Sequence, residues 1–279
     1  MIKSKKSNVT GKVISYILLI FCSAVFLYPL LWMLSSSFRS LEEIAVEGMN
    51  IIPKRLDFQY YVKALTSFPF FLYLRNSLIV TVVSIVATVI SNSIIGYAFA
   101  RFQVRGKNII FMLVLATMLL PSEVQLIPRF ILFRNMGMLD TLYPLFISKL
   151  FGSAYYIFLY RQFYTRLPVG LEEAARLDGC SYFKIWLKIF VPLSKPIFTS
   201  VAIMEFMGTW NSFNDALIYI NSDRYKTLPL GLAGFQGTYS TSTNLLMAAS
   251  IVIILPCIIL FFSAQKAFVE GVTFSGAKE

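Results

Sequence analysis

The sequence contains no histidine, few cysteines and little of the charge that soluble proteins carry. Only 14% of its 279 residues are Asp, Glu, Lys or Arg, whereas a soluble domain has about 25%. Histidine, which this sequence lacks, is the side chain that most often serves as a general base and as a metal ligand. Cys22, Cys180 and Cys257 lie far apart and form no Cys-x-x-Cys pair. We therefore expect no metal, no cofactor and no catalytic centre in this chain.

The residues that are present favour a lipid environment. Hydrophobic residues make up 57% of the chain, including 26 Phe, 15 Tyr and three Trp, and amphipathic rings concentrate at membrane interfaces. The net charge of +11 could indicate nucleic-acid binding, but the basic residues fall between apolar runs instead of clustering on a polar domain. We therefore expect a protein of the lipid bilayer that binds no nucleic acid.

Six apolar runs are long enough to cross a bilayer, which takes roughly 20 mostly apolar residues. They cover residues 13–34, 77–99, 109–128, 142–160, 196–220 and 245–262. The first run follows a Lys-rich start, as in a cleaved signal peptide, but it exceeds the roughly 7–15 apolar residues of such a peptide. We therefore predict an all-α membrane protein with six transmembrane helices, the first of which is an anchor.

The basic residues between these runs predict the orientation. Most of the 25 Lys and Arg residues lie on the side of the two termini, and the positive-inside rule places that side in the cytoplasm. The predicted organisation in the cell membrane is a cytoplasmic N-terminus (1–12), the first span (13–34), an external loop (35–71), a transmembrane domain (72–265) and a cytoplasmic tail (266–279). Within the external loop, the apolar residues of 57–65 permit a short interfacial helix.

Four charged residues lie within or near the predicted spans: Glu123, Lys149, Glu205 and Asp215. Such side chains are costly in hydrocarbon and usually face a cavity or a partner. Lys149 can form an internal ion pair with either Glu123 or Glu205, and the sequence alone leaves both pairings open.

The segment 166–196, on the predicted cytoplasmic side, is unusually polar for its position. Residues 171–177 are good helix formers with two carboxylates in the first turn, where the helix dipole favours them. Asp178-Gly179 is a turn signal, and Ser181 can cap a second helix. Two interpretations fit this pattern. One is a rigid helix-turn-helix that presents Glu172, Glu173 and Asp178 to a partner, and the other is an amphipathic connector whose Lys residues face anionic lipid.

The spacing within this segment resembles a known motif. Residues 173–180 read Glu-Ala-Ala-Arg-Leu-Asp-Gly-Cys, and Ile189, Pro192 and Pro196 follow. This order is similar to the EAA loop of ABC importer permeases, whose pattern is roughly EAAxxDGAxxxxxxxxIxLPxxxP. Cys180 replaces the common Ala and Val191 replaces Leu, and both replacements are small and apolar. The resemblance favours the helix-turn-helix interpretation.

The similarity extends over most of the chain and looks like the carbohydrate branch of this family, of the maltose-permease second-subunit kind. Residues 97–102, 208–211, 227–232 and 235–237 carry it. Phe213-Asn214-Asp215 departs from the sequence that is common in that branch, so the resemblance names no particular sugar. It implies the type I ABC importer permease fold with a cytoplasmic coupling helix, and transport of a sugar or oligosaccharide.

The resemblance also implies partners: a second permease subunit, two cytoplasmic ATP-binding-cassette ATPase subunits and an extracellular solute-binding protein. It implies that the coupling residues are Glu172, Glu173, Ala174, Ala175, Asp178 and Gly179. The chain has no GxxxxGK[ST] phosphate loop. ATP hydrolysis is therefore expected on a partner subunit, and the chain itself is not expected to be an enzyme.

Two further sets of residues are candidates for contact with solute or with the binding protein. Trp210, Asn211, Asn214 and Asp215 combine polar groups with aromatic faces, as sugar sites do. The alternative is that they only hydrate the outer mouth or pack against the sister permease. The loop at 219–244 resembles the one that reaches into the binding protein of maltose-type importers. It implies the contact residues Leu230, Gly231, Phe235, Gln236 and Gly237, and the alternative is a solvated connector.

Two other function classes compete with an importer permease. A stand-alone secondary carrier or channel for small polar solutes is the first alternative, but it has no use for an ATPase-docking loop. A membrane enzyme is the second, and the missing histidine and the lack of a carboxylate or cysteine cluster argue against it. The sequence therefore predicts an importer permease.

Overall fold

A computed structural model describes residues 9–235 and 242–276. These residues are helical and contain no β-strand, which confirms the all-α prediction. The chain divides into two compact units. The first unit comprises residues 1–68 with 232–255, and the second comprises residues 69–231 with 256–279.

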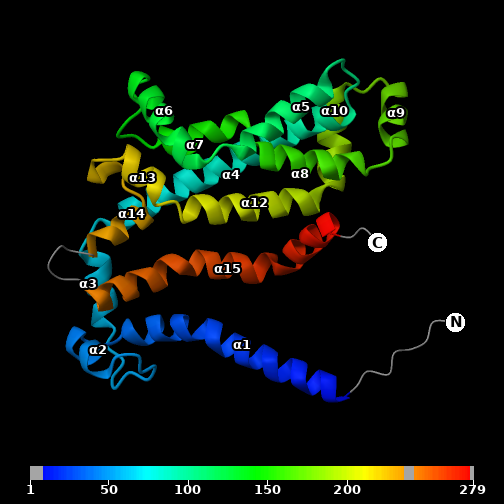
Figure 1. Cartoon of the computed structure of the whole chain (residues 1–279). Helices are drawn as coiled ribbons and strands as arrows, with labels where there is room; N and C mark the ends of the chain where they lie inside the picture. Colours follow the sequence, from blue (N-terminus) through cyan, green and yellow to red (C-terminus); the bar gives the residue numbers. More distant parts are fainter. Residues whose placement is uncertain (1–8, 236–241, 277–279) are drawn as a thin grey trace. The chain divides into compact units, whose positions relative to one another are not determined.

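The first unit contains α1 (Val9–Ser36), α2 (Leu41–Glu47), α3 (Gln59–Thr66) and the first part of α15 (Thr243–Gly276), all labelled in Figure 1. Helix α3 confirms the short helix predicted near residues 57–65. Helix α2 was not predicted. Its signal is the N-cap residue Ser40, whose Oγ accepts a hydrogen bond from the amide of Glu43, three residues later.

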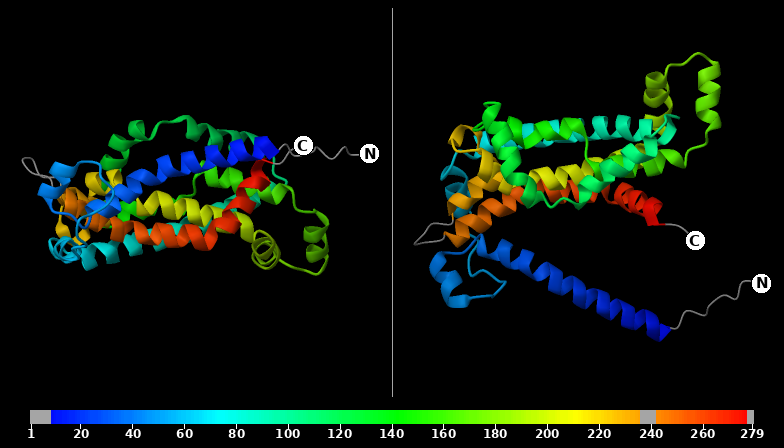
Figure 2. Two further views of the ribbon diagram at one scale, coloured as in Figure 1. Left: turned by 90° about the horizontal axis from the view of Figure 1, so that it is seen from below. Right: turned by 45° about the horizontal axis from the view of Figure 1, so that its top comes forward.

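The second unit is built around the long helix α4 (Phe70–Arg101), which packs against α8 and α12. The remaining helices are α5 (Lys107–Ala116), α6 (Ser122–Asn135), α7 (Tyr143–Phe146), α8 (Ala154–Thr165), α9 (Gly170–Leu177), α10 (Tyr182–Ile185), α11 (Val191–Leu193), α12 (Lys195–Trp210), α13 (Asn214–Tyr219) and α14 (Leu228–Leu232). Figures 1 and 2 show α4, α8 and α12 lying side by side.

Three helical stretches of the described residues are long and apolar enough to cross a membrane: Gly11–Ser36, Phe70–Arg101 and Thr243–Ala264. Two bent pairs, Lys107–Leu119 with Ser122–Asn135 and Tyr182–Leu193 with Lys195–Trp210, raise the number to five if each pair is one span. The fourth predicted span, residues 142–160, is divided among α7, a 3-10 turn at Ile147–Phe151 and α8. A total of six spans therefore stays a prediction.

The break before α8 has a local cause. Gly152 has a φ of +86°, a dihedral that favours glycine. Backbone groups that a break frees inside a membrane need other partners. Asn92 Oδ1 accepts a hydrogen bond from the amide of Ser153 at 2.6 Å, and Ser91 Oγ donates to the carbonyl of Lys149 at 3.1 Å. Side chains of α4 therefore hold the broken segment in place.

Helix α4 meets its neighbours through small polar side chains. Ser84, Thr88 and Ser93 are buried along it, and small residues let membrane helices approach closely. The closest approach is at Gly96, where an added Cβ would lie 2.5 Å from Cβ of Tyr160 on α8. The sequence of α4 therefore sets the distance between α4 and α8.

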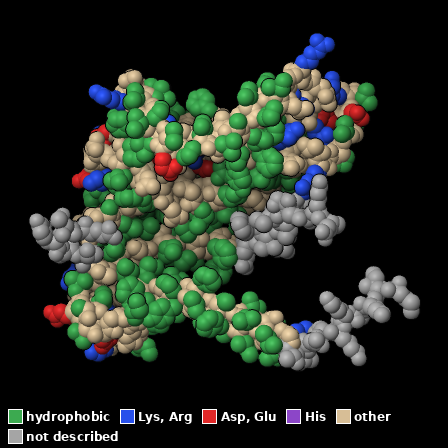
Figure 3. Space-filling view, in the orientation of Figure 1, with side chains coloured by type: hydrophobic (Ala, Val, Ile, Leu, Met, Phe, Trp, Pro, Cys, Tyr) green, Lys and Arg blue, Asp and Glu red, His purple; other side chains and the backbone are tan. Residues whose placement is uncertain are grey.

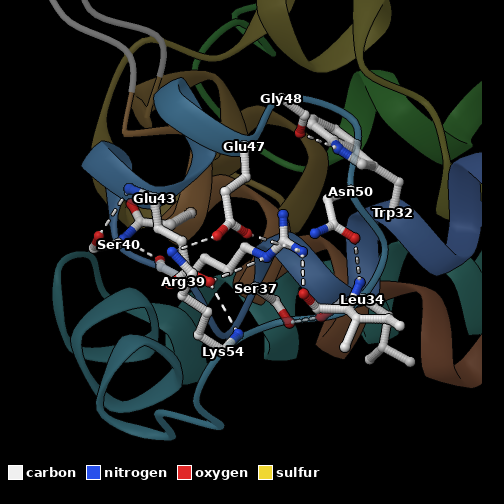
Figure 4. A network of polar contacts seen from close by, with 12 residues as sticks. Trp32, Leu34, Ser37, Arg39, Ser40, Glu43, Glu47, Gly48, Asn50 and Lys54 are labelled. Carbon is white, nitrogen blue, oxygen red and sulfur yellow. Dashed lines mark hydrogen bonds and ion pairs between the residues drawn. The ribbon is translucent and has the colours of Figure 1, made fainter.

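In the first unit, a buried arginine organises the segment that follows α1. Figure 4 shows Arg39 between the carboxylates of Glu43 and Glu47, at 3.6 and 3.9 Å. The guanidinium of Arg39 also donates to the carbonyl of Ile52 at 2.7 Å. Lys54 Nζ lies 2.6 Å from Glu47 Oε1, and this hydrogen bond lowers the pKa of the Glu47 carboxyl. The segment predicted as an external loop is therefore folded.

Large apolar side chains cover the outside of α1. Phe26 is 82% exposed, and Ile17 and Ile20 are exposed as well. Figure 3 shows such side chains in green along this helix. An apolar surface of this kind marks contact with lipid or with another protein in the membrane.

Candidate functional site

Helix α9 stands away from α4, α8 and α12 at one end of the second unit (Figures 1 and 2). Its two sides differ. The buried side has Glu172 and Ala175, and the exposed side has Glu173, Ala174, Leu177 and Asp178. Leu177 is 90% exposed. A protruding helix with small, apolar and acidic residues on its open side has the chemistry to dock against a basic partner.

A tight turn ends α9. Gly179 has a φ of +75°, and the amide of Cys180 donates to the carbonyl of Ala175 at 3.0 Å. A left-handed glycine and such a backward hydrogen bond are the usual end of a helix. Ser181 Oγ then accepts from the amide of Lys184 and caps α10. The turn and the cap that the sequence predicted are both confirmed.

Arg101, the last residue of α4, holds the base of α9. One nitrogen of its guanidinium donates to the carbonyls of Tyr164 and Leu167 at 2.7 and 2.6 Å. Its Nε lies 3.8 Å from Glu172 Oε2, and the guanidinium lies 5.0 Å from the ring centre of Phe190. Burial raises the pKa of the Glu172 carboxyl, and Arg101 opposes this rise. Arg101 therefore ties α4 to α8, α9 and the segment that follows.

A buried aromatic cluster continues this connection. Trp186 and Phe190 belong to a π-helical turn, Trp186–Phe190, and pack with Tyr97 of α4 and Tyr164 of α8. Trp186 Nε1 donates to Ser93 Oγ of α4 at 2.9 Å. Trp186 and Phe190 therefore join the segment after α9 to α4 and α8 in one close-packed cluster.

A second feature is a small polar cavity of about 50 Å3 in the same unit. Its lining residues are Val80, Leu145, Lys149, Gly208, Thr209, Ser212, Asp215 and Thr227. Lys149 Nζ lies 2.9 Å from Glu205 Oε1, and Thr209 Oγ1 donates to the same oxygen at 2.8 Å. Of the two carboxylates that the sequence left open for Lys149, the structure selects Glu205. Glu123 instead accepts from Ser122 Oγ at 2.8 Å.

Comparison with known proteins decides the family. A model of binding-protein-dependent transport system inner membrane components matches residues 92–274. The chain belongs to this family. The arabinooligosaccharides transport system permease protein of Bacillus subtilis (strain 168) is 35% identical to the permease described here, over 92% of each chain. The diacetylchitobiose uptake system permease protein of Streptomyces coelicolor is 29% identical, over 93% of this permease and 87% of its own length.

A solved structure supports the same fold. One chain of a bacterial ABC transporter that imports the acidic polysaccharide alginate superposes on the permease with a TM-score of 0.82. The identity is 24%, and the match covers 96% of the permease and 99% of that chain. The ABC importer permease fold is therefore confirmed. The family places the permease in the inner membrane as a transport component.

The four residues proposed for the solute pathway of the permease differ in their surroundings. Trp210 is buried and stacks on Phe206 with ring centres 5.5 Å apart. Asn211 and Asn214 are exposed. Asp215 alone lines the polar cavity. The cavity brings Asp215 together with Lys149 and Thr227, which the pathway set did not include.

The residues proposed for contact with a binding protein lie mostly in the interior. Leu230 and Gly231 are buried in the second unit, where Leu230 packs near Tyr219. Phe235 is buried in the first unit against Ala248. Gln236 and Gly237 lie outside the described residues. Leu230, Gly231 and Phe235 therefore support the loop and do not form its surface.

Proposed function

We propose that this permease is one subunit of a heterodimeric pair that imports a sugar or oligosaccharide at the expense of ATP. An extracellular binding protein delivers the solute, and two cytoplasmic ATP-binding-cassette subunits hydrolyse ATP. The names of relatives support the cargo class, because they specify arabinooligosaccharides, diacetylchitobiose and starch degradation products. The missing phosphate loop supports hydrolysis on a partner.

The observation that carries this proposal is the protruding helix α9 with its anchored base. We assign its residues to two sides. Glu173, Ala174, Asp178 and Gly179 face the ATPase, where the carboxylates pair with basic groups and the small residues allow close approach. Glu172 and Ala175 are buried and hold α9 to the permease.

The coupling step follows from the contacts below α9. When the ATPase subunits close, they move α9, and Arg101 and the cluster of Trp186 and Phe190 pass this movement to α4 and α8. The helices then rock as a rigid group and open the solute path to the other side. ATP binding drives the change because the closed ATPase binds one state of the permease more tightly.

The proposed orientation follows from the location of α9. Both termini and α9 lie in the cytoplasm, and the folded segment around Arg39 lies outside. The proposed path of the solute runs by Asn211, Asn214 and Asp215, next to the buried Trp210. Leu230, Gly231, Phe235, Gln236 and Gly237 belong to the loop that meets the binding protein.

Reconstitution tests this proposal. The permease, its sister permease and their ATPase are placed in proteoliposomes, and the loaded binding protein is added to one side with radiolabelled arabinotriose, maltotriose or diacetylchitobiose. We expect uptake of at least one sugar with ATP, and no uptake when the ATPase carries a substitution of its phosphate-loop lysine. Equal uptake without a working ATPase, or no uptake of any of the three sugars, would contradict the proposal.

A further inference from the structure

The residues that line the polar cavity carry hydrogen-bond donors and acceptors that are not all paired with one another. Thr227 is buried, since the residue is 4% exposed, and it belongs to the lining of the cavity. Its hydroxyl oxygen has no hydrogen-bond partner in the described part of the chain. A buried hydroxyl without a partner destabilises the folded protein. An occupant of the cavity with a donor or acceptor group would remove that destabilisation.

The wall that carries Thr227 is held rigidly by α4. Ser77 Oγ accepts a hydrogen bond from the amide of Leu228 at 2.9 Å. Asn76 Nδ2 donates to the carbonyls of Arg224 and Lys226, both at 2.9 Å. The backbone on both sides of Thr227 is therefore anchored to α4.

The opposite wall presents charged groups at fixed positions. Glu205, Thr209 and the ammonium of Lys149 form one hydrogen-bonded group, in which Glu205 is 2% exposed. An ammonium has three donors, and the bond to Glu205 uses one of them. Asp215 contributes a carboxylate that accepts from Ser212 Oγ at 3.3 Å. The cavity thus offers donors from Lys149, an acceptor from Asp215, and hydroxyl groups that serve as both.

The walls come from two interrupted helical stretches. Lys149 lies in the broken segment between α7 and α8, and Asp215 lies just after the break between α12 and α13. In transporters, interrupted helices line the places where solutes or ions are held. The surplus donors and acceptors therefore lie where a membrane protein would place a ligand.

The size of the cavity limits what enters it. About 50 Å3 admits a few water molecules, whereas a pocket for a whole drug-sized ligand is several times larger. A sugar ring does not fit, but a hydroxyl or hydroxymethyl group at its edge does. We propose that this cavity is a subsite for one hydroxyl-bearing substituent of the passing saccharide, with Lys149, Asp215 and Thr227 as its hydrogen-bonding residues.

The subsite rests on the proposed function and gives the permease a share in selectivity. A site built to hydrogen-bond a hydroxyl group discriminates strongly against an analogue that lacks it, because its buried groups are then left unpaired. The permease therefore selects among saccharides after the binding protein has released them, in addition to the selection by the binding protein.

The test uses the complete transporter in proteoliposomes, with whichever of arabinotriose, maltotriose and diacetylchitobiose the wild type imports. The variants are Thr227→Val, which keeps the shape of the side chain, and Asp215→Asn. The control is Thr199→Val on α12, where the hydroxyl donates to the carbonyl of Lys195 at 3.0 Å and does not line the cavity. At saturating binding protein, we expect uptake to fall roughly fivefold for Thr227→Val and at least tenfold for Asp215→Asn.

Monodeoxy analogues of the same sugar separate contact from a structural effect. One deoxy analogue should be imported several-fold more slowly than the parent sugar by the wild type, and at nearly the same rate as the parent by Thr227→Val, because the contact is already lost. If every analogue slows both proteins equally, or if the variants match Thr199→Val, the subsite is wrong. If the wild type imports none of the three sugars, the proposed function fails and the subsite fails with it.

Discussion

At the scale of single residues, the turn at Gly179 is the point where the coupling segment depends most on one amino acid. Gly179 has a φ of +75°, and an added Cβ would meet no atom of the described chain within 4 Å. Valine would fit in space, but a β-branched residue is strongly disfavoured at this dihedral. The turn would change direction, and with it the position of α9.

We expect Gly179→Val to abolish ATP-driven uptake while the permease still inserts and assembles. The matched control is Gly137→Val, because Gly137 has a φ of +67° and is equally open in the described residues, but lies outside the coupling segment. Both variants carry the same backbone strain, about 1–2 kcal/mol. Uptake by proteoliposomes and co-purification of the ATPase are the measurements. If both variants lose uptake to the same degree, Gly179 has no special role in coupling.

Asp140 gives a prediction about pH. Its carboxylate accepts hydrogen bonds from the amides of Asn221 and Ser222 at 3.0 and 2.8 Å, and these bonds lower its pKa in the folded protein. The stabilisation is therefore complete above the ordinary pKa of an aspartate, about 3.9, and is lost as pH falls through the lower pKa of the folded state.

Asp140→Asn tests this linkage and keeps a residue that tolerates the positive φ of position 140, +56°. We expect the variant to melt at a lower temperature than the wild type at pH 7, and the difference to shrink as pH falls below 4. Thermal unfolding of the purified permease in detergent, followed by circular dichroism, measures both. A difference that stays constant down to pH 3 would show that the charge of Asp140 contributes nothing.

At the scale of single residues, the sequence predicts the features that are set by residues close by along the chain. Gly179 and Ser181 were predicted correctly because a turn and a cap are set by residues within four positions. Arg101 was missed as the residue that contacts the base of α9, since its partner Glu172 is distant along the chain and no spacing rule joins them. The sequence left two carboxylates open as the ion-pair partner of Lys149. The structure shows that the partner is Glu205, because folding brings these two side chains together.

At the scale of helices, the contact between α4 and α8 depends on a missing side chain. An alanine at position 96 would place its Cβ 2.5 Å from Cβ of Tyr160, and the backbone amide of Arg161 is also close, at 3.2 Å. Neither atom is the end of a flexible side chain, so the helices must separate. Overpacking of this kind costs typically 1–3 kcal/mol.

We expect Gly96→Ala to lower the melting temperature by several degrees. Gly208→Ala is the comparison, because Gly208 lies within α12 and has no atom of the described residues within 4 Å of an added Cβ. There alanine should leave stability unchanged or raise it by up to about 1 kcal/mol, since it restricts the unfolded chain. If both alanine variants melt at the same temperature, α4 and α8 are not packed as described.

The sequence predicts which segments are helical and apolar, but it does not predict where the helices end or are interrupted. Uncharged runs such as 77–99 and 245–262 lie within long helices, α4 and α15. Residues 142–160 are apolar enough to suggest one span, yet Gly152 and the hydrogen bonds from α4 interrupt them. Apolarity reports the environment of a segment, whereas its continuity depends on partners elsewhere in the chain.

At the scale of the whole molecule, we propose that the task of the chain is to convert movement of a separate ATPase into movement of membrane helices. The family and the fold agree with this task. The parts that carry it are the open side of α9, the Arg101 contacts at its base and the aromatic cluster below. The central claim is that the open side of α9 lies in the cytoplasm and is covered by the ATPase.

Site-directed labelling tests this claim most directly. In a background with Cys22, Cys180 and Cys257 replaced by alanine, Ala174→Cys places a thiol on the open side of α9, and Met49→Cys places one at a residue 75% exposed in the folded segment after α1. A membrane-impermeant maleimide is applied to right-side-out and inside-out vesicles, with and without the ATPase subunits. We predict that Ala174→Cys is labelled only from the cytoplasmic face and is protected by the ATPase, whereas Met49→Cys is labelled only from outside and is unaffected. Labelling of Ala174→Cys from outside, or equal labelling with and without bound ATPase, would contradict the account.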